Sequence, residues 1–190
     1  MCFVTGLVTS PPTRGGSLIM ARLIAVLCAL ICVAIPAHAD LLTEAKLGLL
    51  GAGWSARDGQ PSHDRSLDLN AEAIFASSVE FLGGQIHPNF GAAVSLHNLH
   101  KDTNWIYGGG VWQLTIGRVF LGLGFGLALH DGSLSKTYGS RVLFHPQAEL
   151  GVKFTEKYGL SVYVDHMSNG DTVRPNTGLN SAGIRLTYFF

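Results

Sequence analysis

From residue 43 onward the chain contains a series of segments in which large apolar side chains recur at every second position. The segment 119–129 shows this most clearly, because small residues fill most of the positions in between. Its large apolar positions are Val119, Leu121, Leu123, Phe125, Leu127 and Leu129. Successive side chains of a β-strand point to opposite faces, so the period of two predicts a strand with one apolar face.

Eight segments carry a pattern of this kind. They are 43–54, 67–78, 85–98, 104–115, 118–130, 140–154, 158–168 and 179–190. Turn-forming residues gather between them, at 57–62, 99–102, 130–133 and 171–178. No run of about 18 apolar residues, the length that a membrane-spanning helix needs, follows Asp40. We therefore predict an all-β chain of eight strands.

The apolar faces extend over about ten residues, which is the span of a tilted strand that crosses a bilayer. The opposite faces carry polar groups that can hydrogen-bond to one another in a buried network, namely His145, Gln147, Glu149, Asp165 and Arg185. Both features favour an eight-stranded antiparallel transmembrane β-barrel with an apolar exterior and a polar interior. The alternative is a secreted barrel or sandwich with a dry core. Eight strands enclose only enough room for side chains, so we expect no open pore.

The N-terminal 39 residues have the features of a targeting segment. A basic start at 20–22 precedes the apolar run 23–35, and 36–39 end in the small residues that signal peptidase accepts. We expect 1–39 to be an N-terminal extension and cleaved signal peptide, with Met20 as an alternative start, and 40–190 to form the barrel. The strand 179–190 ends on Phe190, which resembles the terminal assembly signal of bacterial outer-membrane proteins.

Composition excludes several kinds of function. The 13 basic and 13 acidic residues cancel, which argues against a nucleic-acid partner. All three cysteines, at 2, 28 and 32, precede the expected cleavage point, so a cysteine nucleophile, disulfide or thiolate metal site is not expected. The scattered histidines are interpreted as surface or interior residues and not as metal ligands; they are His87, His97, His100, His130 and His145.

One apolar face continues into two polar residues. His166 and Ser168 share the parity of the apolar positions 160, 162 and 164. If both chain ends lie in the periplasm, this strand runs outward and the pair faces lipid at its outer end. Polar side chains that face lipid cost free energy unless they are hydrogen-bonded or take part in a function. This depth in the outer leaflet matches that of the ester-linked acyl chains of lipid A.

A histidine and a serine in reach of one ester can hydrolyse it, because the imidazole can take the hydroxyl proton during attack on the carbonyl. Asn180 shares the outer face beside the pair and can orient the imidazole. Asn169 and Asn176, in the following loop, can donate hydrogen bonds to the developing oxyanion.

The C-terminal region resembles a known family. The segment 166–170, His-Met-Ser-Asn-Gly, followed by 175–181 and the strand 183–190, is similar to the C-terminal signature of the lipid A 3-O-deacylases, outer-membrane acyloxyacyl hydrolases of the PagL type. The resemblance covers 40–190, although the first six strands match in pattern only. It implies an eight-stranded barrel in the bacterial outer membrane, lipid A of lipopolysaccharide as the substrate, and no metal or cofactor. It also implies that His166 is the general base, Ser168 the nucleophile and Asn176 part of the oxyanion hole.

The chain departs from the family at the third catalytic position, where a glutamate is usual and Asn180 stands here. An amide can accept the imidazole N–H and fix the tautomer, as in Cys-His-Asn enzymes, but it brings no charge. The equivalent Asp-to-Asn change in serine proteases lowers the rate by about 10⁴. Asp171 in the loop is an alternative partner for His166, whereas Asp165 is expected to face inward.

A second interpretation is a small structural or adhesive outer-membrane barrel without chemistry. His166 and Ser168 would then hydrogen-bond lipid head groups or a neighbouring chain in the interfacial band. The expected partners are lipid A and the outer membrane, and the choice between monomer and homodimer stays open.

Overall fold

The computed structural model describes residues 41–54, 61–77, 79–96, 103–132 and 137–190. The expected signal peptide, at 1–39, therefore lies outside the described residues. Among those residues, no helix has the length and hydropathy needed to cross a membrane.

The described chain folds into nine strands, of which eight are long and one is short. They are β1 (Leu42–Trp54), β2 (Pro61–Phe75), β3 (Val79–Phe81), β4 (Gly84–Ser95), β5 (Trp105–Ile116), β6 (Val119–His130), β7 (Val142–Lys153), β8 (Tyr158–Met167) and β9 (Leu179–Phe189).

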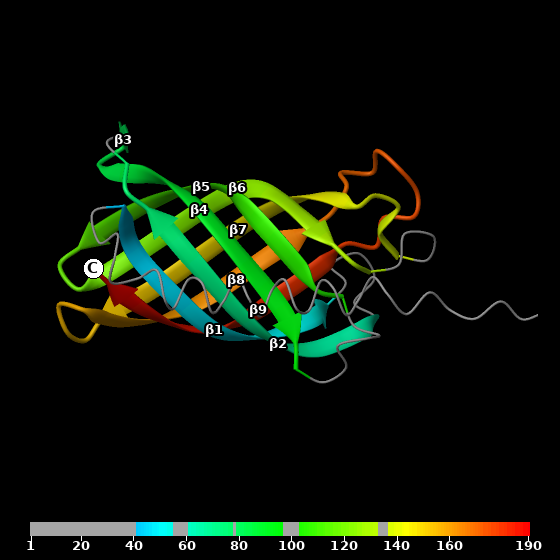
Figure 1. Ribbon diagram of the computed structural model, residues 1–190, viewed down its shortest axis with the longest axis horizontal. Coiled ribbons are helices and arrows are strands. Elements are labelled where there is room, and N and C mark those ends of the chain that lie inside the picture. The colour runs from blue at the N-terminus through cyan, green and yellow to red at the C-terminus, as the bar shows by residue number, and fades with distance from the viewer. Residues whose placement is uncertain (1–40, 55–60, 78, 97–102, 133–136) are drawn as a thin grey trace, which may run out of the picture.

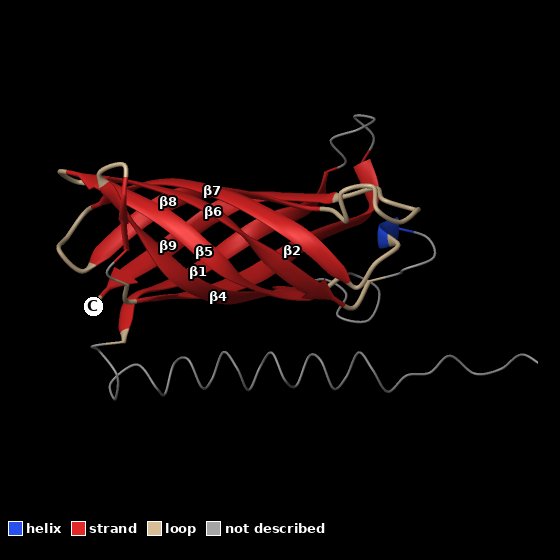
Figure 2. Ribbon diagram, turned by 90° about the horizontal axis from the view of Figure 1, so that it is seen from above, coloured by secondary structure: helices blue, strands red, loops and turns tan. Residues whose placement is uncertain are grey.

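The eight long strands form a closed antiparallel barrel (Figures 1 and 2). Each long strand pairs with the next long strand in the chain, so that β2 pairs with β4 past the short β3, and β9 closes the barrel by pairing with β1. The β5–β6 and β7–β8 turns lie at the end where the chain finishes, and the β6–β7 and β8–β9 loops lie at the other end (Figure 1). The predicted eight-stranded barrel is confirmed.

Two segments differ from the prediction. β2 begins at Pro61, six residues before the predicted strand at 67, and pairs there with the end of β1. Residues 62–66 are all polar, so this part of the strand has no apolar face that alternation could reveal. The β3–β4 hairpin was also missed, because its turn is Leu82-Gly83 and lacks the Asn-Gly or Asp-Gly pair typical of such turns.

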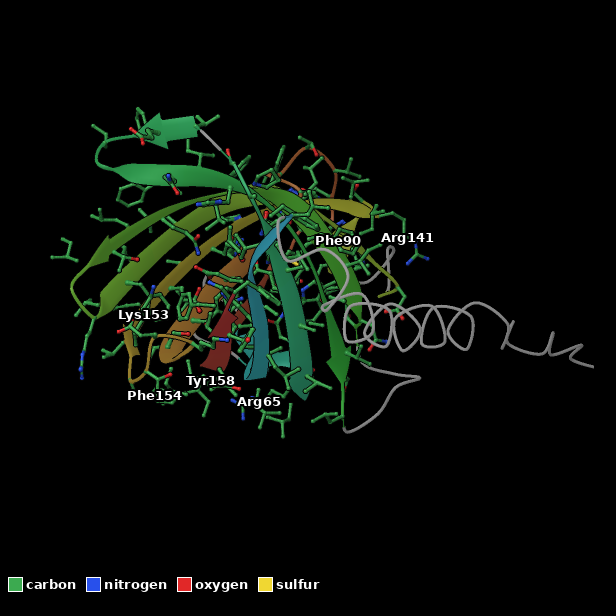
Figure 3. The ribbon with its side chains drawn as sticks, turned by 60° about the vertical axis from the view of Figure 1, so that its left-hand side comes forward. Arg65, Phe90, Arg141, Lys153, Phe154 and Tyr158 are labelled. Carbon is green, nitrogen blue, oxygen red and sulfur yellow. The ribbon has the colours of Figure 1, made fainter. Side chains whose placement is uncertain are left out.

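The exterior of the barrel is apolar. In β8, Leu160, Val162 and Val164 are exposed, and the residues between them are buried. Val162 keeps 61% of its surface exposed, which is unfavourable in water and is the arrangement of a strand that faces lipid. At the short-turn end, Phe154 and Tyr158, both labelled in Figure 3, stack with ring centroids 6.3 Å apart, as expected of an aromatic interfacial band.

A buried ionic network fills the interior. The guanidinium of Arg185 on β9 lies 2.6 Å from Glu72 of β2 and 2.6 Å from Glu149 of β7, and stacks 3.8 Å above the ring of Tyr163. The Arg185 side chain therefore links three strands of the barrel, β2, β7 and β9. Nearby, Lys46 pairs with Glu149 and lies 3.0 Å from Glu44.

A second part of the network lies closer to the C-terminal end of β8. The Tyr163 hydroxyl donates to Gln147 at 2.8 Å and to Asp165 at 3.1 Å, and Asp165 also contacts His145 at 3.1 Å. Gln147 donates to Glu72 at 3.4 Å, which links the two parts. The network predicted from the polar faces is confirmed, and it extends to β1 and β2.

Replacing Arg185 with leucine is expected to leave Glu72 and Glu149 as poorly compensated buried charges. Breaking a buried ion pair from one side costs about 3–5 kcal/mol, so the free energy of unfolding in urea should fall by about that amount. Arg118→Leu, on the exposed β5–β6 turn, is the control and should leave the urea midpoint unchanged. Equal midpoints for the two variants would contradict the bracing role of Arg185.

Candidate functional site

The C-terminal end of β8 presents two polar side chains on the barrel exterior. His166 and Ser168 are half-buried and share the face of the exposed Val162 and Val164. The residues between and after them, Met167 and Asn169, point inward and are buried. The outward direction that the alternation predicted for the pair is therefore confirmed.

Asn180 of β9 is hydrogen-bonded to the imidazole of His166. It lies opposite His166 in the β8–β9 register, and its side-chain oxygen accepts a hydrogen bond from His166 Nδ1 at 2.7 Å. An acceptor at Nδ1 holds the proton there and leaves Nε2 as the basic nitrogen. This is the tautomer that a general base for a serine hydroxyl requires.

Gly178, just before β9, lies beside the Cε1–Nε2 edge of the imidazole. It has a φ of +67°, a left-handed conformation that favours glycine. A Cβ atom at this position would lie 3.0 Å from His166 Cε1 and 3.7 Å from Nε2. The Asn180 amide therefore contacts Nδ1 of the ring, and the Gly178 backbone leaves no room for a side chain beside Cε1. Sequence reasoning missed this contact, and the glycine after Pro-Asn-Thr was its only signal.

Two backbone hydrogen bonds to Phe144 fix the position of Ser168. Its N–H donates to the Phe144 carbonyl at 3.2 Å, and its own carbonyl accepts from the Phe144 N–H at 2.8 Å. This bridge extends the β7–β8 pairing beyond Met167 and keeps the serine side chain on the outer face. In the part of the chain that the structure describes, no hydrogen bond joins the Ser168 hydroxyl to His166. Catalytic hydrogen bonds of this kind often tighten only when substrate binds.

The β8–β9 loop positions Asn176. The Asn176 side-chain oxygen accepts from the backbone N–H of Asn169 at 3.1 Å, and its NH₂ group donates to Asp171 at 3.2 Å on the exposed side. The buried Asn169 side chain donates at 2.7 Å both to the Tyr138 carbonyl and to the Val173 carbonyl. Because these bonds use both carboxamide protons, the Asn169 side chain serves here to hold the loop.

The same loop is docked on the β6–β7 loop. Both the backbone N–H and the hydroxyl of Thr177 donate to the Thr137 carbonyl, at 3.0 Å and 3.1 Å. The two loops lie together at the end of the barrel that is opposite the short turns (Figure 1). Asn176 is therefore carried on a braced loop beside the pair on β8.

Neither nearby aspartate occupies the position that Asn180 has beside His166 Nδ1. Asp165 faces inward, as predicted, and contacts His145 and Tyr163. Asp171 accepts from Asn176 and lies 3.9 Å from Arg174 in the exposed part of the loop. The described partner of His166 Nδ1 is the uncharged Asn180.

A groove of about 530 Å³ lies on the exterior beside His166 and Asn180. Its floor includes Ala148, Val164 and Ala182, which form one row across β7, β8 and β9. The two alanines are short, and this leaves a hollow in a surface that is otherwise covered by leucine and valine. Sequence reasoning missed the groove, because it depends on which residues become neighbours across strands.

The histidines away from β8 have local partners. His87 Nδ1 lies 3.0 Å from the Phe75 carbonyl, His130 Nε2 lies 2.7 Å from the Ser140 carbonyl, and His145 contacts Asp165. His97 and His100 lie outside the described residues. Within the described ranges, no three or more His, Cys, Asp or Glu residues form a group that could hold a metal ion.

Comparisons with known proteins place this geometry in context. The family model described as "Lipid A 3-O-deacylase (PagL)" matches residues 42–189. The crystal structure of the outer membrane enzyme PagL matches with a TM-score of 0.57 and 14% identity, over 76% of this chain and 97% of that one. The N-terminal β-barrel domain of Pseudomonas aeruginosa OprF matches with a TM-score of 0.52 and 11% identity, over 79% and 99% of the two chains. At these identities, both structures establish a shared barrel fold. No curated protein sequence matches this chain.

Gly178→Ala is expected to push the His166 imidazole out of line and lower the kcat for hydrolysis of a soluble nitrophenyl ester by about 10². Gly170→Ala is the matched control, because Gly170 lies in the same loop and has a φ of +65°, but its added Cβ would meet Phe144. The two variants share the backbone strain and differ in their contact with His166. Equal losses of kcat would mean that Gly178 does not position the imidazole.

Proposed function

The chain belongs to the lipid A 3-O-deacylase (PagL) family, and from this premise we propose that it hydrolyses the ester of the 3-hydroxyacyl chain at position 3 of lipid A. The reaction takes place in the outer leaflet of the bacterial outer membrane. The observation that carries the proposal is the Asn180–His166 hydrogen bond beside Ser168 on the apolar exterior of the barrel.

The position of the pair suits a substrate that arrives through the membrane. His166 and Ser168 follow the apolar positions of β8, so they lie where the acyl region of the outer leaflet meets its head groups. The groove next to His166 is mainly apolar and can hold an acyl chain with the ester near the imidazole. A lipid can therefore diffuse laterally to the site without leaving the bilayer.

In the first step, the Ser168 hydroxyl attacks the ester carbonyl while His166 Nε2 takes its proton. The tetrahedral intermediate carries a negative oxygen, and the NH₂ group of Asn176 is the donor that we assign to it. This donor contacts only the exposed Asp171 carboxylate among the described residues, and the oxyanion can replace that contact.

Collapse of the intermediate breaks the bond to the sugar oxygen at position 3, which receives the proton from His166. Water, activated by the same imidazole, then attacks the acyl-serine and releases the 3-hydroxy fatty acid. Asn180 holds the Nδ1 proton throughout, so that Nε2 alternates between base and acid. Asn169 contributes by holding Asn176 through its backbone N–H.

Because Asn180 is uncharged, it stabilises the protonated form of His166 less than a glutamate would. Its oxygen fixes the tautomer but does not offset the positive charge that His166 acquires during attack. Asp165 is adjacent in sequence but points into the barrel, where His145 and Tyr163 bind its carboxylate. We infer that the enzyme works with an uncharged orienting residue.

Ser168→Ala should abolish deacylation in a bacterial host whose own lipid A keeps its 3-O-acyl chains. The mass spectrum of extracted lipid A should show loss of one 3-hydroxyacyl group with the native protein and no loss with the variant. The heat-modifiable migration of the barrel in gels controls for folding and should be the same for both. Intact lipid A in cells that carry the folded native protein would refute the enzymatic assignment in favour of a structural barrel.

Asn180→Glu should raise kcat, because a carboxylate at position 180 would stabilise the imidazolium; the gain should lie between about 10-fold and 10⁴-fold. Asn180→Ala should lower kcat, since nothing would then hold the Nδ1 proton. Asn180→Gln, which has the glutamate shape without the charge, is the control for side-chain length. If glutamate and glutamine gave the same rate, the charge at this position would not be what limits the enzyme.

A further inference from the structure

A short hairpin leaves the barrel at the end opposite the catalytic pair. The pairing of β2 with β4 ends at Ile74–Asn89, and β3 then pairs with the first residues of β4, from Val79–Ile86 to Phe81–Gly84. Figures 1 and 3 show β3 and the start of β4 standing away from the wall of the barrel. This hairpin, residues 79–86, has no place in the catalytic site.

The apolar face of the hairpin continues the exterior of the barrel. Val79, Ile86, Trp112 and Leu123 are successive neighbours in register across β3, β4, β5 and β6. Leu123 belongs to the exposed apolar exterior, and Val79 and Phe81 on the same face of the hairpin are 54% and 55% exposed. The lipid-facing surface thus extends onto the hairpin without a break.

The turn of the hairpin contains an unusual residue. Leu82 has a φ of +47° and Gly83 a φ of +76°, the pair of positive values that two-residue hairpin turns of type I′ require. Asparagine or aspartate is preferred at the first position, and a leucine with positive φ is strained. Leu82 is also 78% exposed. Neither backbone strain nor water favours a leucine here, which indicates that its side chain meets an apolar partner.

The hairpin is poorly suited to binding another strand. β3 has three residues, and its Val79 N–H is bonded to the Ser77 hydroxyl at 3.1 Å. A short edge with an occupied donor offers little to a strand that would add to the sheet. The Trp112 indole N–H donates to the Phe81 carbonyl at 2.6 Å, which satisfies its polar group while its ring stays on the exterior row. These contacts favour lipid as the partner.

We propose that residues 79–86 form a membrane foot that inserts Val79, Phe81 and Leu82 into the phospholipid leaflet at the short-turn end of the barrel. Because the hairpin flares away from the wall, it lies along the boundary between head groups and acyl chains. The foot fixes the height of the barrel in the bilayer, and hence the depth of His166 and Ser168 at the opposite end.

The test is the accessibility of a nitroxide spin label at Leu82→Cys, in the full chain with its three native cysteines replaced by serine, refolded into phosphatidylethanolamine–phosphatidylglycerol vesicles. The label should collide more often with oxygen, which concentrates in lipid, than with a water-soluble nickel chelate. Glu156→Cys, in the exposed β7–β8 turn at the same end, is the control and should show the reverse. Preferential collision of the label at position 82 with the chelate, or spin–spin broadening from a second copy, would overturn the proposal.

A second variant separates lipid contact from turn chemistry. Leu82→Asn places a preferred residue in the turn and removes the apolar side chain. Because this variant loses the lipid contact of Leu82, we expect its melting temperature in these vesicles to be about 2–4 °C lower than that of the native protein, despite the better turn residue. A melting temperature that stays equal or rises would show that Leu82 gains nothing from lipid.

Discussion

The Arg185 guanidinium on β9 pairs with Glu72 of β2 and with Glu149 of β7, and the polar interior of the barrel depends on this contact. With charges of both signs neutralised inside, each strand can keep its polar face inward and its apolar face outward. A β-strand has only two faces, so this choice also directs the residues at the strand ends. On β8 it buries Ser161, Tyr163 and Asp165 and leaves His166 and Ser168 on the side that meets lipid.

The same constraint explains the charge of the site. Asp165 is covalently next to His166, yet the period of two sends its carboxylate to the interior, where it completes the network with His145 and Tyr163. On the outer face, the residue opposite His166 in β9 is Asn180. An enzyme on this scaffold can recruit an orienting group only from the outer row of a neighbouring strand or from the loop. The identity of one residue on β9 therefore sets the electrostatics of the imidazole.

Much of the barrel and of the candidate site could be predicted from the sequence, because alternate residues of a strand point to opposite faces. The alternation in β6 and β8, the inward direction of Asp165, and the place of Asn180 beside His166 all follow from counting residues along two antiparallel strands. The polar start of β2 could not be found this way, because a strand beyond the apolar belt loses its alternation. The contact of Gly178 with the imidazole and the groove over Ala148 and Ala182 depend on loop conformation and on cross-strand register. The Leu82 turn was missed because leucine is not a residue that such turns usually contain at the first position.

The central claim is that Ser168 is a nucleophile activated by His166 and reached from the lipid phase. A long-chain alkyl fluorophosphonate, which partitions into membranes and reacts with activated serine hydroxyls, tests it directly when the labelled protein is digested and its peptides are mapped by mass spectrometry. The account predicts one adduct on Ser168, which disappears in His166→Ala while the barrel stays folded. An unmodified Ser168, an adduct on an inward-facing serine such as Ser161, or labelling that survives the loss of His166 would contradict it.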